Sequence, residues 1–284
     1  MSAAPGRPKQ AKAPPGGSEP RAAGSVGAIL LAAGRGERMR PLTDTCPKPL
    51  LPVRGKPLMQ WPLEALLRAG ITRVVVNTAW LEPQIPACFG DFFAAFGNSD
   101  KETLLSISEQ TSAPPRPPGI HLSYSHEGRD FGGALETAGG IARALPQLPD
   151  VFWVLAGDVF APDFVFDPAA AQQFAAGTDL AHLWLVPNPP HNPKGDFGLS
   201  ASGRALNDAA PGGMRHTYST MALVRAALFA PPFCAIPPGN PAGIKAPLAP
   251  LLRAAIAAGR VGATLYPGAW TDVGTPERLA ALNT

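Results

Sequence analysis

Apolar runs alternate with segments of helical period along most of the chain from residue 26 onward. Short runs rich in valine, isoleucine and leucine predict buried strands, and apolar positions three and four residues apart predict helices. Such an alternation is typical of an α/β fold with a mainly parallel sheet. The predicted strands are Val26 to Ala32, Arg73 to Thr78, Ile120 to Ser125, Val151 to Ala156, Leu180 to Val186 and His216 to Val224, with a further strand from Thr264 that leads to Asp272.

Helices are predicted between these strands. The first runs from Pro57 to Ala69, because proline suits a first helical turn and Gly70 suits the position just past the last turn. A second covers Glu136 to Leu145. A third carries the apolar positions Leu248, Leu251, Leu252, Ala255 and Ile256, and Leu199 to Leu206 is expected to form a hairpin. We therefore expect a single domain over residues 25–284.

Two segments fall outside this pattern. Residues 1–24 are rich in proline, alanine and glycine and have no apolar core, which predicts a disordered tail. Residues 97–119 are polar and rich in proline, which predicts a surface insertion.

Composition narrows the class of protein. The chain has 284 residues, 45% of them hydrophobic, and a formal net charge of +3. Four basic residues and one acidic residue fall in the tail, so the other 260 residues are neutral and a nucleic-acid partner is not expected. The three cysteines are far apart, which argues against disulfides and a zinc site. No apolar segment is long enough to span a membrane and no secretory signal is recognisable, so we expect a cytoplasmic protein.

Glycines and basic residues follow the first strand directly, between Leu31 and Pro49. A dinucleotide fingerprint fails because methionine stands where its third glycine belongs, and the lysine of a P-loop is missing from its place. Gly34 and Gly36 would still let the backbone approach phosphate oxygens, Arg40 could bind them with two donors, and Lys48 adds a compact charge. The pattern predicts a triphosphate site.

The stretch from Leu31 to Pro49 resembles the signature of the sugar-1-phosphate nucleotidylyltransferases, with R-M-x-P-L-T followed by P-K-P. The resemblance covers most of Val26 to Ala281, including Gly157-Asp158 and the "DVGTPERL" stretch from Asp272 to Leu279. It implies a Rossmann-like fold with a mixed, mainly parallel sheet flanked by helices. It also implies transfer of a nucleotidyl group from a nucleoside triphosphate to a sugar 1-phosphate, release of pyrophosphate, and Mg²⁺.

Catalysis of this reaction requires charge neutralisation at the α-phosphorus, which we expect from Arg40, Lys48 and Mg²⁺. The resemblance assigns Asp158 and Asp272 to the metal. Each aspartate ends a predicted strand, so we expect the two to face one crevice from opposite sides. Two carboxylates with phosphate oxygens and water suit Mg²⁺. No general base is required, because a sugar phosphate is ionised near neutral pH, with a second pKa of about 6. None of the five histidines is assigned to catalysis.

Base and sugar contacts are carried over by position. The nucleotide candidates are Ala32, Ala33, Gly34, Gly36, Asn77, Thr137 and Gly139, and the sugar candidates are Glu136, Asp196 and Thr220. Glu136 and Thr137 have an equal structural reading as first-turn helix residues. Thr220 stands where the family commonly has glycine, which adds bulk near the sugar.

Within the family the chain resembles in particular the N-acetylmuramate α-1-phosphate uridylyltransferases of peptidoglycan recycling. The stretches that carry this resemblance are "VVVNTAWL" (residues 74–81), "LETAGGI" (135–141), "LVPNPPHNPKGDFGL" (185–199) and "APLLRAAIAAGRV" (249–261). The Val-Glu-Lys-Pro segment of glucose-type enzymes is missing. The resemblance implies UTP and N-acetylmuramate 1-phosphate as substrates. The alternatives are a mannose-1-phosphate guanylyltransferase and a non-catalytic subunit that binds a nucleotide sugar.

Overall fold

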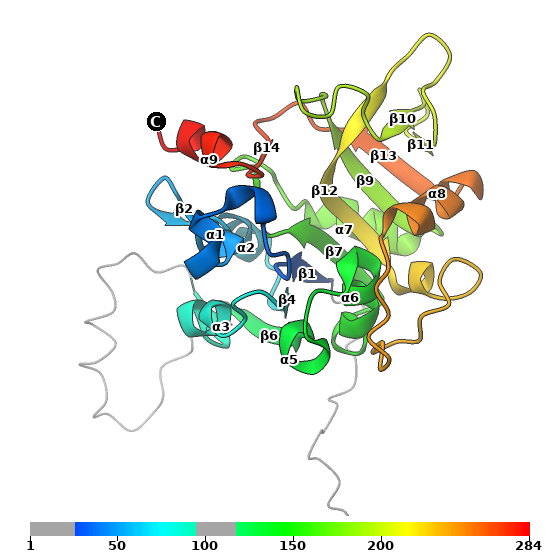
Figure 1. Ribbon diagram of the computed structural model, residues 1–284. Coiled ribbons are helices and arrows are strands. Elements are labelled where there is room, and N and C mark those ends of the chain that lie inside the picture. Colours follow the sequence, from blue (N-terminus) through cyan, green and yellow to red (C-terminus); the bar gives the residue numbers. More distant parts are fainter. Residues whose placement is uncertain (1–25, 95–117) are drawn as a thin grey trace, which may run out of the picture.

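The computed structural model describes residues 26–94 and 118–284. The predicted tail at residues 1–24 lies outside the described residues, as does nearly all of the predicted insertion at residues 97–119. The described chain forms a ten-stranded sheet with helices packed on both faces (Figure 1). This arrangement is the α/β class that the alternating pattern predicts.

The first strand lies at the centre of the sheet. β1 (Gly27–Leu31) pairs in parallel with β4 (Arg73–Thr78) on one side and with β7 (Val151–Ala156) on the other. Beyond β4, β6 (Ile120–His126) is parallel and the short β5 (Phe92–Phe93) is antiparallel. The chain thus moves outward from β1 with β4 and β6 and then returns to the other side of β1 with β7.

The other half of the sheet is mostly antiparallel. β12 (Arg215–Arg225) pairs with β7 and with β9 (Ala181–Val186), and β13 (Val261–Leu265) then pairs in parallel with β9. In the hairpin of β10 (Phe197–Leu199) and β11 (Ala205–Leu206), β10 pairs with the first residues of β12. The predicted hairpin is therefore present.

Both faces of the central strands are buried, as expected for parallel strands covered by helices. Along β1, Ala28 and Leu30 join one hydrophobic core and Ile29 joins the other. The first core is covered by α2 (Gln60–Arg68) and α7 (Pro168–Ala176), and the second by α6 (Glu136–Ala144) and α8 (Ala249–Ala257). The alternation of side chains along one strand thus fills two cores at once.

A third, smaller core joins distant parts of the chain. It contains Met39 from the loop after β1, Phe160, Val273 and Leu279. The hairpin of β2 (Pro52–Val53) and β3 (Lys56–Pro57) contributes Val53, and α9 (Pro276–Leu282) carries Leu279. Figure 1 shows α9 beside α1 and β2, which come early in the sequence.

Two predicted boundaries are corrected. The first helix begins at Gln60 and not at Pro57, because Pro57 pairs with Pro52 in the β2–β3 hairpin. The last long strand begins at Val261, three residues before the predicted start. Several short elements complete the described chain: η1 (Glu37–Met39), α1 (Leu42–Thr45), η2 (Lys48–Leu50), α3 (Gln84–Phe89), α5 (Glu127–Phe131), η3 (Leu145–Gln147), β8 (Val159–Phe160), η4 (Ala226–Phe229) and β14 (Thr271–Asp272). Within residues 26–94 and 118–284, no helix has the length and apolar character needed to cross a membrane.

Candidate active site

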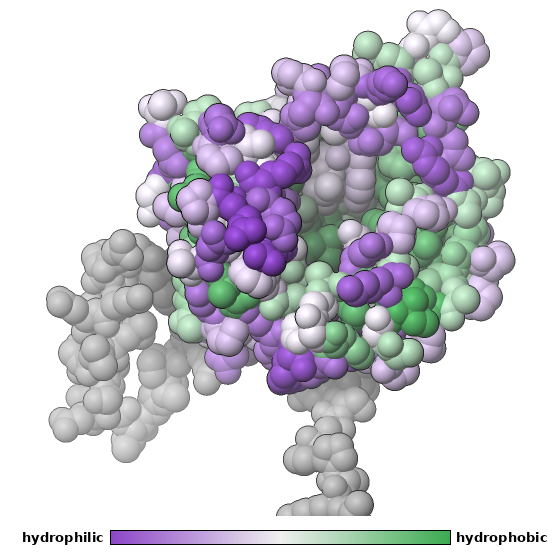
Figure 2. All heavy atoms as spheres, viewed as in Figure 1, coloured by the Kyte–Doolittle hydropathy of each residue, from purple (hydrophilic) through white to green (hydrophobic). Residues whose placement is uncertain are grey.

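A cavity of about 790 Å³ opens at the carboxyl ends of β1 and β7, where Leu31 and Ala156 line it. The strand order reverses between these two strands, because the chain leaves β1 on one side and returns with β7 on the other. Open α/β sheets bind their ligands at such a reversal. Figure 2 shows this face hollowed at its centre, with apolar residues in the floor and hydrophilic residues along much of the rim.

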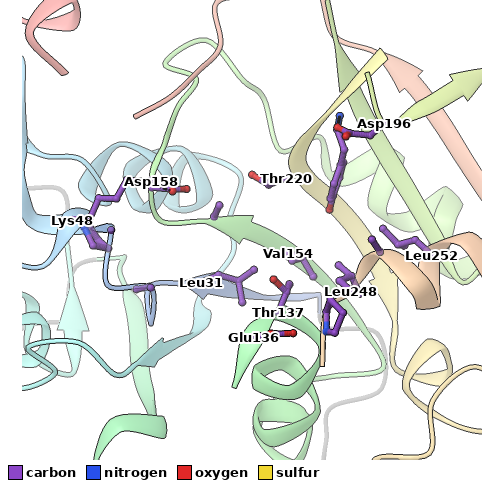
Figure 3. Close-up of a pocket in the computed structure, with 18 of the residues that line it drawn as sticks. Leu31, Lys48, Glu136, Thr137, Val154, Asp158, Asp196, Thr220, Leu248 and Leu252 are labelled. Carbon is purple, nitrogen blue, oxygen red and sulfur yellow. Dashed lines mark hydrogen bonds and ion pairs between the residues drawn. The ribbon is translucent and has the colours of Figure 1, made fainter. Parts of the chain in front are cut away.

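The cavity has two chemically different ends. Figure 3 shows Lys48 and Asp158 at one end, which we call the lysine end. Asp196 and Leu252 lie at the other, which we call the α8 end, and Thr220 lies between the two. Nine of the residues predicted from sequence line this cavity: Ala32, Gly34, Gly36, Lys48, Glu136, Thr137, Asp158, Asp196 and Thr220.

The glycine-rich loop forms one wall of the lysine end. Ala32 and Ala33 are buried, whereas Gly34 is exposed and has open space where a Cβ would stand. Gly36 adopts φ +67°, a conformation that glycine takes without strain, and its carbonyl accepts a hydrogen bond from Thr43 Oγ1 at 2.9 Å. A Cβ on Gly36 would press against the Lys48 stem at 3.3 Å. The loop is thus folded tightly around the lysine.

Lys48 and Asp158 form an ion pair. Lys48 Nζ donates to Asp158 Oδ2 at 2.5 Å, and the lysine side chain is only 10% exposed while that of the aspartate is 37% exposed. Lys48 begins η2 between two prolines, and Asp158 follows Gly157 directly after β7. A buried lysine requires such an anionic partner. The pair places one fixed positive and one accessible negative charge where phosphates would bind.

Asp272 lies next to Asp158 along the backbone. β14 pairs with β8, and the Val273 N–H donates to the Asp158 carbonyl at 2.8 Å. The two aspartates therefore come from neighbouring strands of one ribbon, which corrects the expectation that they face each other across the crevice. Asp272 Oδ1 lies 2.5 Å from Arg278 Nη1 and 2.9 Å from His191 Nε2. Its side chain does not line the cavity.

Arg40 is not brought to the cavity. Its side chain is 52% exposed and pairs with Asp44 at 2.8 Å and with Glu37 at 3.9 Å. Asp44 lies four residues further along, so the first turn of α1 presents its carboxylate to the guanidinium. Arg38, in the same loop, is exposed and has no carboxylate partner among the described residues.

Asn77 lies behind the cavity in a buried hydrogen-bond chain. Its Oδ1 accepts from the Ala32 N–H at 2.7 Å, and its Nδ2 donates to Glu127 Oε1 at 2.7 Å. Glu127 is fully buried, and its Oε2 accepts from the Leu135 N–H at 2.7 Å. Burial raises the pKa of Glu127, against the lowering effect of the bonds from Leu135 and Asn77. Asn77 thus positions the loop after β1 and the start of α6 and does not face the cavity.

The first residues of α6 form another wall. Glu136 is exposed with φ +59°, an unusual conformation for a residue with a side chain, and it lines the cavity with Thr137. Gly139 does not line it. A Cβ at Gly139 would overlap the Ile244 carbonyl oxygen, and the Gly139 N–H donates to the Ala246 carbonyl at 3.2 Å. Gly139 therefore serves close packing between α6 and the extended segment at residues 244–246.

β12 positions both Asp196 and Thr220. Asp196 Oδ2 accepts from the Tyr218 N–H at 2.8 Å. Thr220 stands at a bulge in β12 with φ +63°, and its Oγ1 donates to the Ser219 carbonyl at 2.6 Å. The Ser219 carbonyl also accepts from Trp270 Nε1 at 3.0 Å. Thr220 thus occupies a left-handed position that favours glycine.

Sequence reasoning missed three residues around the cavity. Tyr218 and Arg253 line the α8 end, and Glu127 supports the wall from behind. Glu127 lies on a helix of five residues that carries no recognisable motif, so no spacing could mark it. Arg253 follows Leu252 within an otherwise apolar helix. This single charge beside the buried face of the helix is the one feature of the sequence that could have marked Arg253 as a candidate.

The geometry defines a class of protein: an α/β fold with a glycine-rich loop, a lysine and an aspartate at the point where the strand order of its sheet reverses. A model of the nucleotidyl transferase family matches residues 27–207. The N-acetylmuramate alpha-1-phosphate uridylyltransferase of Neisseria meningitidis serogroup B is 43% identical, over 89% of this chain and 94% of that enzyme. The chain therefore belongs to the nucleotidyl transferase family.

Two further matches show that the similarity extends to enzymes named for other sugars. The mannose-1-phosphate guanylyltransferase catalytic subunit beta of Danio rerio is 34% identical over 49% of this chain and 32% of its own length. The Bacillus anthracis structure assigned as a glucose-1-phosphate thymidylyltransferase, in complex with sucrose, superposes with a TM-score of 0.66 and 18% identity. It covers 91% of this chain and 94% of its own. The last match supports the fold alone, and it agrees with the Rossmann-like class predicted from sequence.

Proposed function

We propose that this nucleotidyltransferase moves a uridylyl group from UTP to N-acetylmuramate α-1-phosphate, with release of pyrophosphate, as a step of peptidoglycan recycling. The observation that carries the proposal is the 43% identity to the Neisseria enzyme over 94% of that enzyme's length. The cavity agrees with it, because one end offers charges for phosphates and the other offers room for a sugar.

The chemistry follows from the lysine end. An ionised oxygen of the sugar phosphate attacks the α-phosphorus of UTP, the bond from that phosphorus to the oxygen bridging to the β-phosphate breaks, and pyrophosphate leaves. Lys48 would neutralise charge that builds up on the phosphate oxygens. Gly34, with open space around it, would let the triphosphate approach the backbone. No protein base is needed, because the nucleophile is already ionised.

Asp158 and Asp272 suit a magnesium ion. They are hard oxygen ligands from adjacent strands, and Mg²⁺ takes one or two carboxylates with phosphate oxygens and water. Asp158 lines the cavity, whereas Asp272 lies outside its lining with Oδ1 held by Arg278, so its Oδ2 would be the oxygen available to the ion. Within the described residues no cluster of three or more His, Cys, Asp or Glu side chains could enclose a metal, so phosphate oxygens would complete the shell. When bound, Mg²⁺ would neutralise the triphosphate and orient it for in-line attack.

A substrate panel tests the proposal. Pyrophosphate release is measured for UTP, GTP and dTTP against N-acetylmuramate, mannose and glucose 1-phosphates, with and without Mg²⁺. We expect turnover with UTP and the muramate only in the presence of Mg²⁺. Selective use of GTP and mannose 1-phosphate would instead support guanylyl transfer, and no turnover of the muramate would reject the proposal.

The variant Asp158→Asn tests the metal assignment in the same panel. Asparagine keeps the shape but loses the charge, so we expect at least a hundredfold loss of turnover with the fold intact by circular dichroism. Asp163→Asn is the matched control, because Asp163 is exposed and outside this cavity. Equal activity of both variants would remove Asp158 from the site.

Neither Arg38 nor Arg40 lines the cavity, and Arg38 is the arginine we propose for the phosphates. Asp44 and Glu37 already neutralise Arg40, whereas Arg38 has no carboxylate partner within the described chain. We expect Arg38→Met to lower kcat by about a hundredfold or more and Arg40→Met by less than about tenfold, since removal of one charge-stabilising donor costs about 10² to 10³ in kcat. Steady-state kinetics with UTP and the muramate measure both. A larger loss for Arg40→Met would restore the assignment made from sequence.

A further inference from the structure

The walls of the α8 end are largely apolar, with one cation, Arg253, and one carboxylate, Asp196. These walls include Val154, Leu248 and Leu252, which leave few partners for sugar hydroxyls. Among the described residues that line the cavity, Lys48 and Arg253 are the two with a positive charge. Lys48 is paired with Asp158 at the other end, so the α8 end has a positive charge of its own.

Arg253 is held in place without being neutralised. Its Nη1 and Nη2 donate to the carbonyls of Asn207 and Asp196, both at the long distance of 3.4 Å, and its guanidinium lies 5.1 Å from the centre of the Phe197 ring. No carboxylate lies within salt-bridge distance of it in the described chain. A guanidinium has five N–H donors in a fixed fork, so most of the donors of Arg253 remain available to a ligand.

The nearest acid does not compensate this charge. The Asp196 side chain is turned to β12, where its Oδ2 accepts from the Tyr218 N–H at 2.8 Å and from Asn192 Nδ2 at 3.2 Å. Arg253 contacts only the backbone carbonyl of Asp196. Asp196 therefore forms no ion pair with Arg253, and the guanidinium remains available to an anion.

Tyr218 adds an aromatic ring to the same wall. The residue lines the cavity, whereas its hydroxyl oxygen is buried out of reach of solvent and has no hydrogen-bond partner among the described residues. Tyr218 therefore offers apolar contact to a ligand in the cavity and no hydrogen-bond donor.

We propose that Arg253 binds a carboxylate on the acceptor sugar, with Leu248, Leu252 and Tyr218 against the apolar part of the same branch. The proposal rests on the proposed function. N-acetylmuramate differs from N-acetylglucosamine by a lactyl ether, which has one methyl group and one carboxylate. Arg253 is thus a specificity-determining residue, and the sugar candidates from sequence, two acids and a threonine, could not supply this recognition.

Paired kinetics test the proposal. The ratio of kcat/KM for N-acetylmuramate 1-phosphate to that for N-acetylglucosamine 1-phosphate is measured for wild type, Arg253→Met and Arg253→Lys. We expect Arg253→Met to lower this ratio at least tenfold, because a bidentate, charge-assisted contact is lost from one substrate only. Arg253→Lys should fall between, since it keeps the charge and loses the fork. Arg73→Met is the matched control: Arg73 is exposed at the start of β4, away from the cavity, and its ratio should equal that of wild type.

The outcomes separate the two proposals. An equal loss with both sugars, or no loss with either, would overturn the role of Arg253 while leaving uridylyl transfer to the muramate in place. A wild-type enzyme that does not use the muramate at all would overturn the proposed function and this inference with it. Thermal unfolding of each variant verifies that the compared proteins are folded.

Discussion

At the scale of single residues, the most constrained feature is the chain of hydrogen bonds from Ala32 through Asn77 and Glu127 to Leu135. Each bond fixes the direction of the next. Asn77 must place its oxygen toward the Ala32 N–H, which leaves its amide to face Glu127, and Glu127 must accept on both oxygens. The buried polar groups are satisfied in only one arrangement, and that arrangement sets the position of two cavity walls.

An exchange of the amide at position 77 and the carboxylate at position 127 tests the direction of these hydrogen bonds. In Glu127→Gln alone, the new amide group faces an N–H donor. In Asn77→Asp alone, the new carboxylate faces the carboxylate of Glu127. We expect each variant to lose about 1–3 kcal/mol of unfolding free energy. In the double variant, the new carboxylate at position 77 accepts from the Ala32 N–H and from the new amide at position 127, whose oxygen still accepts from the Leu135 N–H. Urea unfolding should show the double variant more stable than either single variant. Additive losses would show that the chain of bonds is not coupled.

The pH dependence of stability follows from the same carboxyl group. Burial raises the pKa of Glu127 from its ordinary value of 4.5, so the folded state binds a proton that the unfolded state has released. Wild type should therefore lose stability relative to Glu127→Gln as the pH rises above about 4.5 toward the raised value. Urea unfolding of both proteins between about pH 4 and pH 8 measures this difference. A difference that grew in favour of wild type with rising pH would contradict the assignment.

At the scale of elements, α6 and the segment at residues 244–246 depend on one glycine. The Ala246 carbonyl accepts from the Ala138 and Gly139 N–H groups, and the Ala246 N–H donates to the Leu135 carbonyl at 3.1 Å. The segment thus satisfies backbone donors that the first turn of α6 would otherwise leave free. It also leads directly into Pro247 and Leu248 of the α8 end.

Gly139→Ala should separate these two elements. The added methyl group would overlap the Ile244 carbonyl, so we expect a loss of about 2 kcal/mol or more despite the better helix propensity of alanine. Gly133→Ala is the matched control, because a Cβ there meets nothing within 4 Å. Differential scanning calorimetry of both variants provides the measurement. Equal melting temperatures would show that the segment yields freely.

The sequence predicts the elements with strong periodicity and misses those without it. β1, β4, β7 and β9 are near-continuous apolar runs, and the structure has each within one or two residues of its predicted bounds. α7 was not predicted, although Asp167 caps its start and Pro168 opens its first turn, because its alanines and glutamines form no apolar stripe. β8 and β14 are two residues each, which is too short for any period.

The site divides in the same way. Lys48 and Asp158 follow contiguous motifs, and the structure brings them together across 110 residues. The sequence does not show that Arg40 and Asn77 point away from the cavity. Their directions are set by hydrogen bonds to Asp44 and Glu127, and only the structure shows these contacts. Arg253 belongs to the part of the cavity that forms only when α8 packs beside β11 and β13.

At the scale of the whole molecule, the small third core connects the glycine-rich loop to the last helix. Leu279 of α9 is buried with Met39 of that loop and with Val53, and the Arg54 N–H donates to Asn283 Oδ1 at 2.6 Å. The loop that positions Lys48 therefore rests on residues more than two hundred positions away in sequence.

Leu279→Ala should weaken both stability and activity. A buried leucine truncated to alanine costs about 2–5 kcal/mol, and the cavity would open beneath the loop. We expect a lower midpoint in urea and a raised KM for UTP at temperatures where the protein is still folded. Leu265→Ala, at a leucine that is 38% exposed, should change neither by much. An unchanged KM for UTP in Leu279→Ala would show that the third core does not support the glycine-rich loop.

The same long-range packing orders events during synthesis. A growing chain can form β1 and its neighbours early, but the support beneath its glycine-rich loop is missing until α9 has left the ribosome. The glycine-rich loop therefore gains this support only after α9 has been synthesised. A ligand that binds at the loop would stabilise the chain only once α9 has folded.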